Sequence, residues 1–122
     1  MTQATYSEMI RSADELPFDL FLSRWLLMPE CESISGFDPS NLDHSAEVLR
    51  TVYDEINLPI QSLRAASGLS QRRFADLFAI PFRTVQNWEA RGGCPIYLRL
   101  LFRPHIGLTP ISEILGVDQT AK

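Results

Sequence analysis

With 122 residues, 45% of them hydrophobic, the chain is long enough to bury one core and does not have a disordered composition. It contains no run of eighteen apolar residues, and residues 1–11 lack the basic and apolar regions of a signal peptide, so we expect no membrane span, no export and a cytoplasmic location. The net charge of −4 argues against a nucleic-acid-binding protein only if the charge is evenly spread along the chain.

The first half of the chain is predicted to be an acidic helical segment. Apolar residues recur at helical spacing over residues 5–15 and 44–57, and either Asn41 or Asp43 is a suitable N-cap for the second of these helices. Between the two, residues 30–42 are polar and contain glycine and proline, which predicts a loop.

Residues 18–28, flanked by Pro17 and Pro29, are predicted to form a helix that is apolar on most of its circumference. Such a helix is either central to the fold, where the N-terminal helices cover the rest of the chain, or part of a partner surface. If it is a partner surface, its anchors are expected to be Phe18, Phe21, Trp25 and Leu26.

Three helices outside the central motif are predicted, over residues 59–67, 95–103 and 110–115. Each begins at a proline, which suits the first helical position because the amide hydrogen that proline lacks has no partner there. Pro104 is expected to end the second of them, and Val117 to Lys122 are expected to be loose.

Residues 69–95 are the most informative stretch, because they contain two short helices joined by a tight turn. The first helix is predicted over residues 70–78, with Ser70 as its N-cap. Its apolar residues recur at helical spacing and are expected to be buried: Phe74, Ala75, Leu77 and Phe78.

The second helix of this pair is predicted over residues 81–90, starting at Pro81, with Val85 and Trp88 turned inward. Gly92 and Gly93 are expected to stop it. Its outward residues are Phe82, Arg83, Thr84, Gln86 and Asn87. Side chains of these types reach the donors and acceptors of base edges in a major groove, with arginine suited to guanine, asparagine to adenine and phenylalanine to the thymine methyl group.

Residues 59–103 resemble the Cro/C1-type (XRE) helix-turn-helix family. The matching residues are Leu63, Arg64, Gly68 to Gln71, Phe74, Ala75, Ile80, Thr84 to Glu89, and Pro95. The resemblance implies an all-α protein of six to seven helices, with a lambda-repressor-like helix-turn-helix domain and additional N-terminal helices. One position departs from the family, because Ala79 stands where glycine is usual in the turn. If that residue needs a positive φ, alanine costs on the order of 1 kcal/mol.

The resemblance also implies a role for each side chain. Phe82, Arg83, Thr84 and Asn87 are expected to read bases, with Gln86 at the flank of this set. Contacts to the DNA backbone are expected from Gln71, Arg72, Arg73 and Arg91, so that loss of Arg72 weakens binding to all DNA about equally. Arg64 and Glu89 are expected to form a structural ion pair, and Trp88 to be a core residue.

The charge is divided along the chain in a way that fits these roles. Residues 1–58 carry three arginines and eleven acidic residues, residues 59–103 carry seven arginines and two acidic residues, and residues 104–122 carry one lysine and two acidic residues. The balances are −8, +5 and −1, so the basic charge is concentrated in the motif. We therefore expect three segments: an acidic N-terminal one for cover, partner binding or dimerisation, the helix-turn-helix domain, and a C-terminal short helix and tail.

The expected function is sequence-specific binding of double-stranded DNA by a homodimeric transcriptional repressor, because one recognition helix reads only about half a site. The dimer surface is expected either in the helices after Gly93 or in residues 18–28. The alternative is an antitoxin that binds a basic, RNA-cutting toxin through its acidic N-terminal segment and autoregulates through the motif.

An enzyme, a cofactor and a metal site are not expected. The sequence has no glycine-rich phosphate loop and no nucleophile with a nearby base. Cys31 and Cys94 are far apart and are expected to be unpaired thiols. With His44 and His105 they lack the paired spacing of a zinc site.

Overall fold

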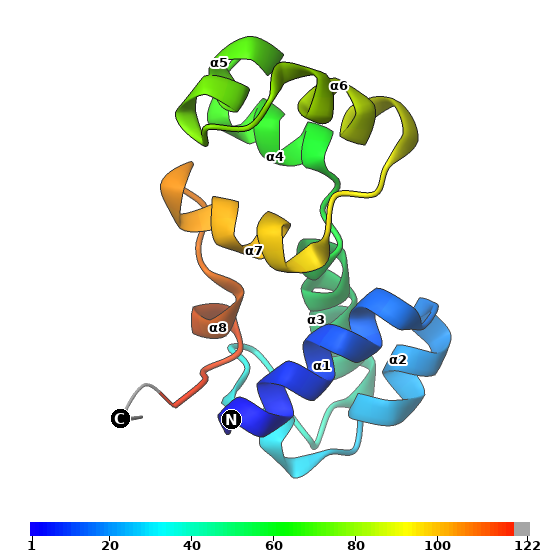
Figure 1. The fold of residues 1–122 in the computed structure, drawn as a ribbon. Helices are drawn as coiled ribbons and strands as arrows, with labels where there is room; N and C mark the ends of the chain where they lie inside the picture. The colour runs from blue at the N-terminus through cyan, green and yellow to red at the C-terminus, as the bar shows by residue number, and fades with distance from the viewer. Residues whose placement is uncertain (119–122) are drawn as a thin grey trace. The chain divides into compact units, whose positions relative to one another are not determined.

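The structure is a computed structural model that describes residues 1–118, and it is all-α (Figure 1). In this range the chain forms eight α-helices, one short 3-10 helix and no strand, which confirms the predicted class. The eight helices exceed the total of six to seven that was expected, but each lies in one of the segments that the sequence predicted to be helical. No helix in the described range has both the length and the apolar character needed to cross a membrane.

The chain divides into two compact units. Unit 1 comprises Met1–Asn57 together with the segment that begins at Pro110, and unit 2 comprises Leu58–Thr109. The helices of unit 1 are α1 (Gln3–Glu15), α2 (Phe18–Trp25), the 3-10 helix η1 (Pro29–Ser33), α3 (Leu42–Ile56) and α8 (Ile111–Ile114). The helices of unit 2 are α4 (Ile60–Ser67), α5 (Gln71–Leu77), α6 (Phe82–Arg91) and α7 (Ile96–His105).

The core of unit 1 is built around two aromatic residues of α2. Phe21 and Trp25 are both buried, and the Trp25 indole Nε1 donates a hydrogen bond of 2.8 Å to the Ser12 hydroxyl of α1. The Tyr53 ring of α3 lies 5.1 Å from the Phe21 ring and 5.4 Å from the Phe18 ring, measured between centroids. Aromatic packing of this kind joins α1, α2 and α3 into one core.

The α2 helix is shorter than the sequence predicted, because it ends at Trp25 and not at residue 28. Met28 has an extended backbone with ψ of 124°, the conformation that a following proline favours, and Pro29 then starts η1 in a stretch predicted to be loop. Leu27 is consequently outside the helix and 77% exposed. Asn41 is the N-cap of α3, its Oδ1 accepting from the His44 amide at 3.1 Å.

The C-terminal segment of unit 1 is held by hydrogen bonds to the start of the chain and to η1. The Ser33 hydroxyl donates to the Leu115 carbonyl at 2.6 Å, and the Asp118 amide donates to the Met1 carbonyl at 2.9 Å. Val117, which was expected to be loose, is buried, so that expectation is wrong at this residue. The rest of the expected loose tail, residues 119–122, lies outside the described residues.

In unit 2, prolines mark where three of the helices begin. Pro59, Pro81 and Pro95 are the N-cap residues of α4, α6 and α7, so each of these helices begins one residue later than the sequence predicted. Pro104 does not end α7, because the helix continues to His105. After the helix, Gly107 at φ +86° allows the Leu108 amide to close the helix end on the Arg103 carbonyl at 2.9 Å.

The core of unit 2 is a cluster of buried side chains from all four of its helices and from the segment between α6 and α7: Ile60, Leu63, Phe74, Ala75, Val85, Cys94 and Phe102. The rings of Phe74, Phe78 and Phe102 lie 4.5 to 5.3 Å apart between centroids. Leu77, expected to be buried with them, is 56% exposed. At about 100° per residue, Phe74, Ala75 and Phe78 share a face of α5 and Leu77 lies beyond its edge.

The turn between α5 and α6 contains Ala79 at φ +55°, the one residue other than glycine with a positive φ in the described range. The Ala79 amide donates to the Asp76 carbonyl at 3.2 Å, and the Ile80 amide donates to the Ala75 carbonyl at 2.9 Å. These two bonds form a Schellman motif, which usually places glycine at the position that Ala79 occupies. The positive φ therefore is required here, and the alanine side chain strains the turn.

We expect Ala79→Gly to raise the free energy of unfolding by about 1 kcal/mol, because glycine adopts a positive φ without the clash of a Cβ atom. The measurement is urea denaturation followed by circular dichroism. Gly68→Ala is the matched control, since Gly68 caps α4 at φ +74° and a Cβ there meets no atom within 4 Å. Gly68→Ala should lower the free energy of unfolding by a similar amount. If Ala79→Gly destabilises the protein, the inference that Ala79 strains the turn is contradicted.

Candidate nucleic-acid interface

The outward face of α6 is polar and open to solvent. Arg83, Gln86 and Asn87 are exposed, as the sequence predicted, while Val85 on the opposite face is fully buried and Trp88 packs against the core cluster of unit 2. Thr84, the fourth expected base reader on this helix, is only partly exposed. Residues 83, 86 and 87 are three or four positions apart, so their side chains share one face of the helix.

The seven arginines of unit 2 fall into two groups. Four of them are exposed on α5 and α6: Arg72, Arg73, Arg83 and Arg91. The other three are bound to the scaffold. The Arg99 guanidinium donates to the carbonyls of Cys94 and Leu58 at 3.2 and 3.1 Å, and the buried Arg103 donates to the Thr109 carbonyl at 2.8 Å.

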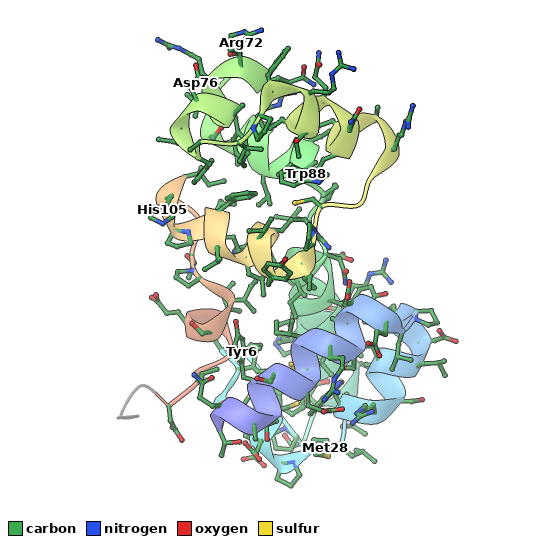
Figure 2. All side chains as sticks on the ribbon, in the orientation of Figure 1. Tyr6, Met28, Arg72, Asp76, Trp88 and His105 are labelled. Carbon is green, nitrogen blue, oxygen red and sulfur yellow. The ribbon has the colours of Figure 1, made fainter. Side chains whose placement is uncertain are left out.

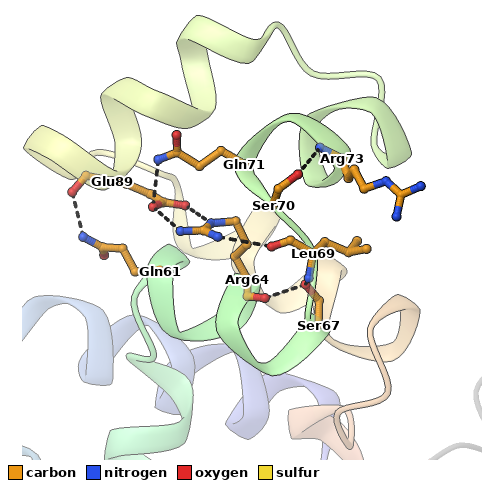
Figure 3. Close-up of polar contacts among 8 residues, drawn as sticks. All are labelled: Gln61, Arg64, Ser67, Leu69, Ser70, Gln71, Arg73 and Glu89. Atoms are coloured by element: carbon orange, nitrogen blue, oxygen red, sulfur yellow. Dashed lines mark hydrogen bonds and ion pairs between the residues drawn. The ribbon is translucent and has the colours of Figure 1, made fainter.

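The third scaffold arginine, Arg64, forms the expected ion pair with Glu89 (Figure 3). Its Nε donates to Glu89 Oε2 at 2.6 Å and its terminal nitrogen to Glu89 Oε1 at 3.0 Å, which is a bidentate contact. The other terminal nitrogen donates to the Leu69 carbonyl at 3.1 Å. One guanidinium on α4 thus holds both the segment before α5 and the inner face of α6.

Two glutamines complete this network (Figure 3). Gln71 Nε2 donates to Glu89 Oε1 at 3.1 Å, and Gln61 Nε2 donates to the Glu89 backbone carbonyl at 2.7 Å. Gln71 was expected to contact the DNA backbone, and the structure places its side-chain amide in the scaffold, with one amide hydrogen used by Glu89. Sequence reasoning missed Gln61, whose contact joins residues 28 positions apart.

The pKa values of the ion pair reflect this geometry. The hydrogen bonds from Arg64 lower the pKa of Glu89 below its ordinary value of 4.5, and the bond from Gln71 lowers it further. The Glu89 carboxylate in turn raises the pKa of Arg64. Because the Glu89 side chain is only 8% exposed, its charge depends on these donors and not on water.

Arg72 and Phe82 are in contact, although they come from different helices, α5 and α6. The Arg72 guanidinium carbon lies over the Phe82 ring, 4.1 Å from its centroid. Arg72 is exposed and extends outward from α5 (Figure 2), and Phe82, the first residue of α6, is partly buried. Such a contact is a cation–π interaction, which holds both side chains in place.

The expected partner anchors in unit 1 are not available as a set. Phe21 and Trp25 are in the core of that unit, Phe18 packs on Tyr53, and Leu26 is partly buried at the end of α2. Phe21 and Trp25 therefore cannot serve as surface anchors, because α1 and α3 cover the face of α2 that carries them. The large apolar side chains that unit 1 does expose are Leu20, Leu27, Met28 and Leu42.

Cys31 and Cys94 are both unpaired and buried, and they belong to different units. Burial raises the pKa of each thiol to about 11, so neither is ionised near neutral pH. Among residues 1–118, no group of three or more histidine, cysteine, aspartate or glutamate side chains is arranged to hold a metal ion.

Comparisons with protein-family models, with curated proteins and with solved structures found no match to this chain.

We expect Arg64→Ala to lower the free energy of unfolding by roughly 2–4 kcal/mol, because it leaves the nearly buried Glu89 carboxylate without its main donor. Arg83→Ala is the matched control, since it removes the same charge from an exposed position and should change stability by about 0.5 kcal/mol or less. Urea denaturation of both variants gives the comparison, and equal midpoints for the two would contradict a structural role for the ion pair.

The ion pair should also make stability depend on pH. Because the pKa of Glu89 is lower in the folded state, its contribution is complete above about pH 4.5 and is lost as the pH falls through the folded-state value. Glu89→Gln should therefore lose less stability on acidification than the unchanged chain. Thermal unfolding between neutral pH and pH 3 measures this, and parallel pH profiles for the two proteins would exclude the contribution.

Proposed function

We propose that this protein is a sequence-specific, double-stranded DNA-binding transcriptional regulator whose α5 and α6 are the two helices of a lambda-repressor-like helix-turn-helix. The observation that carries the proposal is the exposed face of Arg83, Gln86 and Asn87 on a helix that is fixed from behind by the Arg64–Glu89 pair. A rigid helix with an exposed polar face presents donors and acceptors that match those of base edges.

The dimensions of the pair support this proposal. Four residues, 78–81, separate α5 from α6, a connection close to the three or four residues typical of helix-turn-helix units. At 1.5 Å per residue the ten residues of α6 span about 15 Å, and a helix fits a major groove about 12 Å wide. The Schellman turn at Ala79 and the ion pair at Glu89 fix the two ends of α6 in unit 2.

Each exposed side chain of α6 has a defined role in this proposal. The Arg83 guanidinium donates two hydrogen bonds to guanine O6 and N7, and the Asn87 amide bonds adenine N6 and N7. Gln86 extends the same face, and the partly exposed Thr84 contacts the neighbouring base. These contacts select a sequence, because each base pair presents a different pattern in the major groove.

Affinity for any DNA sequence comes from the exposed arginines around this face. In this proposal Arg73 on α5 and Arg91 at the end of α6, which are both exposed, contact phosphates. Unit 2 carries +5 while the residues of unit 1 carry −9, so the attraction to DNA is confined to unit 2. Such binding weakens steeply as salt rises, because each neutralised phosphate releases counterions.

A homodimer completes the proposal. One α6 reads about half a site, and two copies on half-sites one helical turn apart bind more tightly and with greater specificity. Occupancy of promoter DNA by the dimer then represses transcription by excluding the polymerase.

We expect Arg83→Ala and Asn87→Ala each to remove the preference for one base pair, at a cost of about 1–3 kcal/mol for the preferred sequence only. The measurement is selection from a randomised duplex library with the full chain, followed by mobility shifts on the enriched sequence and on a scrambled one. Arg91→Ala is the control, because loss of a phosphate contact should weaken both duplexes about equally and reduce the salt dependence by about one phosphate.

The result that excludes the proposed function is a folded, unaltered chain that enriches no sequence from the library. If it enriches a sequence but Arg83→Ala keeps the same preference, the chain binds specific DNA through a different surface.

A further inference from the structure

The contact between Arg72 and Phe82 is the least expected feature of the exposed surface of unit 2. A guanidinium that contacts phosphate needs only charge and reach, so it does not need to be held against a ring. Arg72 is nevertheless held, 4.1 Å from the Phe82 ring centroid. In the described part of the chain its guanidinium takes part in no ion pair, so its donors remain available to a ligand.

Phe82 is the first residue of α6, and the N-terminal residues of a recognition helix are those that contact base edges. The ring therefore brings the Arg72 guanidinium from α5 to the end of α6 that contacts bases. Arg72 thus contacts the first residue of the helix that carries the proposed reading face of Arg83 and Asn87.

We propose that Arg72 and Phe82 together form a binding site for two adjacent base pairs, a 5-methylpyrimidine, thymine in ordinary DNA, next to a guanine. The proposal rests on the proposed function and assigns the bases that this part of the motif takes. Arg72 becomes a base-reading residue in place of the phosphate contact that the sequence predicted.

The spacing of the two side chains fits the spacing of two base pairs. The guanidinium and the ring are 4.1 Å apart, and successive base pairs are separated by about 3.4 Å. If the stack runs along the DNA axis, the two side chains meet neighbouring base pairs. The edge of the guanidinium donates to O6 and N7 of guanine, and the ring makes an apolar contact with the C5-methyl group of the adjacent thymine.

The stack also has an energetic consequence. An exposed arginine loses its rotamer freedom when it binds a base, and Arg72 has already lost part of that freedom against Phe82. The cation–π contact preorganises the guanidinium. More of the hydrogen-bond energy is then left to discriminate guanine from other bases. The two residues should then act as one unit, and losing either should remove the same preference.

Arg72→Lys separates base reading from phosphate binding. Lysine keeps the positive charge, but it has neither a planar group that stacks on the ring nor the paired N–H donors that bind O6 and N7 of guanine. Arg72 is exposed, so the change does not disturb the core. Arg73→Lys is the matched control on the same helix, since Arg73 is exposed and has no such ring contact. Phe82→Leu removes the ring while keeping an apolar side chain, and circular dichroism verifies that this variant is folded.

The experiment uses the full chain and the sequence that it enriches from a randomised duplex library. We expect that sequence to contain thymine next to guanine. Arg72→Lys should reduce the preference for this guanine on the order of ten-fold, without changing the affinity for scrambled DNA or the salt dependence. Arg73→Lys should leave the preference for guanine intact, and Phe82→Leu should reduce that preference about as much as Arg72→Lys does.

A change in the DNA provides a second, independent measurement. Replacing the thymine by deoxyuridine removes only the methyl group and should weaken binding by the unaltered chain about four-fold, the value of one buried methyl group. The Phe82→Leu variant should not distinguish the two duplexes to the same extent. Because the comparison of the two duplexes uses the unaltered chain, it does not depend on the stability of any protein variant.

Retention of the guanine preference by Arg72→Lys would overturn this inference while leaving the proposed function in place. An enriched sequence without a thymine–guanine pair would also overturn it. If the unaltered chain enriches no sequence, the proposed function fails and the inference fails with it, and that outcome is recognised from the unaltered chain alone.

Discussion

The bidentate contact between Arg64 and Glu89 holds the inner face of α6 to α4, and the remaining features of unit 2 depend on it. Glu89 is nearly buried, so its charge is tolerable only with the donors of Arg64 and Gln71 in place. The same guanidinium also binds the Leu69 carbonyl before α5. One side chain of α4 thus positions both α5 and α6, and it fixes the direction in which the outer face of α6 points.

This arrangement divides similar side chains between two tasks. Arg64, Arg99 and Arg103 use their donors on protein carboxylate or carbonyl groups, whereas the four arginines on the outer side of α5 and α6 remain exposed. The basic balance of residues 59–103 therefore overstates what a DNA phosphate would meet, because three of the seven charges are bound within the scaffold. The charge that remains free is concentrated where the polar face of α6 is also exposed, and this coincidence supports the proposed function better than net charge does.

The apolar residues of α2 suggested a partner surface, but most of them form the core of unit 1. The apolar circumference of α2 is largely used within the unit, since Phe21 and Trp25 pack among α1 and α3, and the indole nitrogen is satisfied by Ser12. The large apolar side chains left exposed are Leu20 of α2, Leu27 and Met28 in the irregular segment after it, and Leu42 at the start of α3. Apolar residues on several sides of a helix thus reflect two neighbouring helices here, and they do not by themselves indicate a binding surface.

The sequence by itself determined the features that depend on local backbone chemistry: the all-α class, the approximate helix limits set by prolines and glycines, and the Ser70 cap. The Arg64–Glu89 pair was predicted only through a family resemblance, because nothing local links residues 25 positions apart. Tertiary structure alone decided that Leu77 is exposed, that Gln71 joins the scaffold and that Arg72 rests on Phe82. These outcomes depend on which side chains from distant parts of the chain occupy the neighbouring space, and helical spacing does not contain that information.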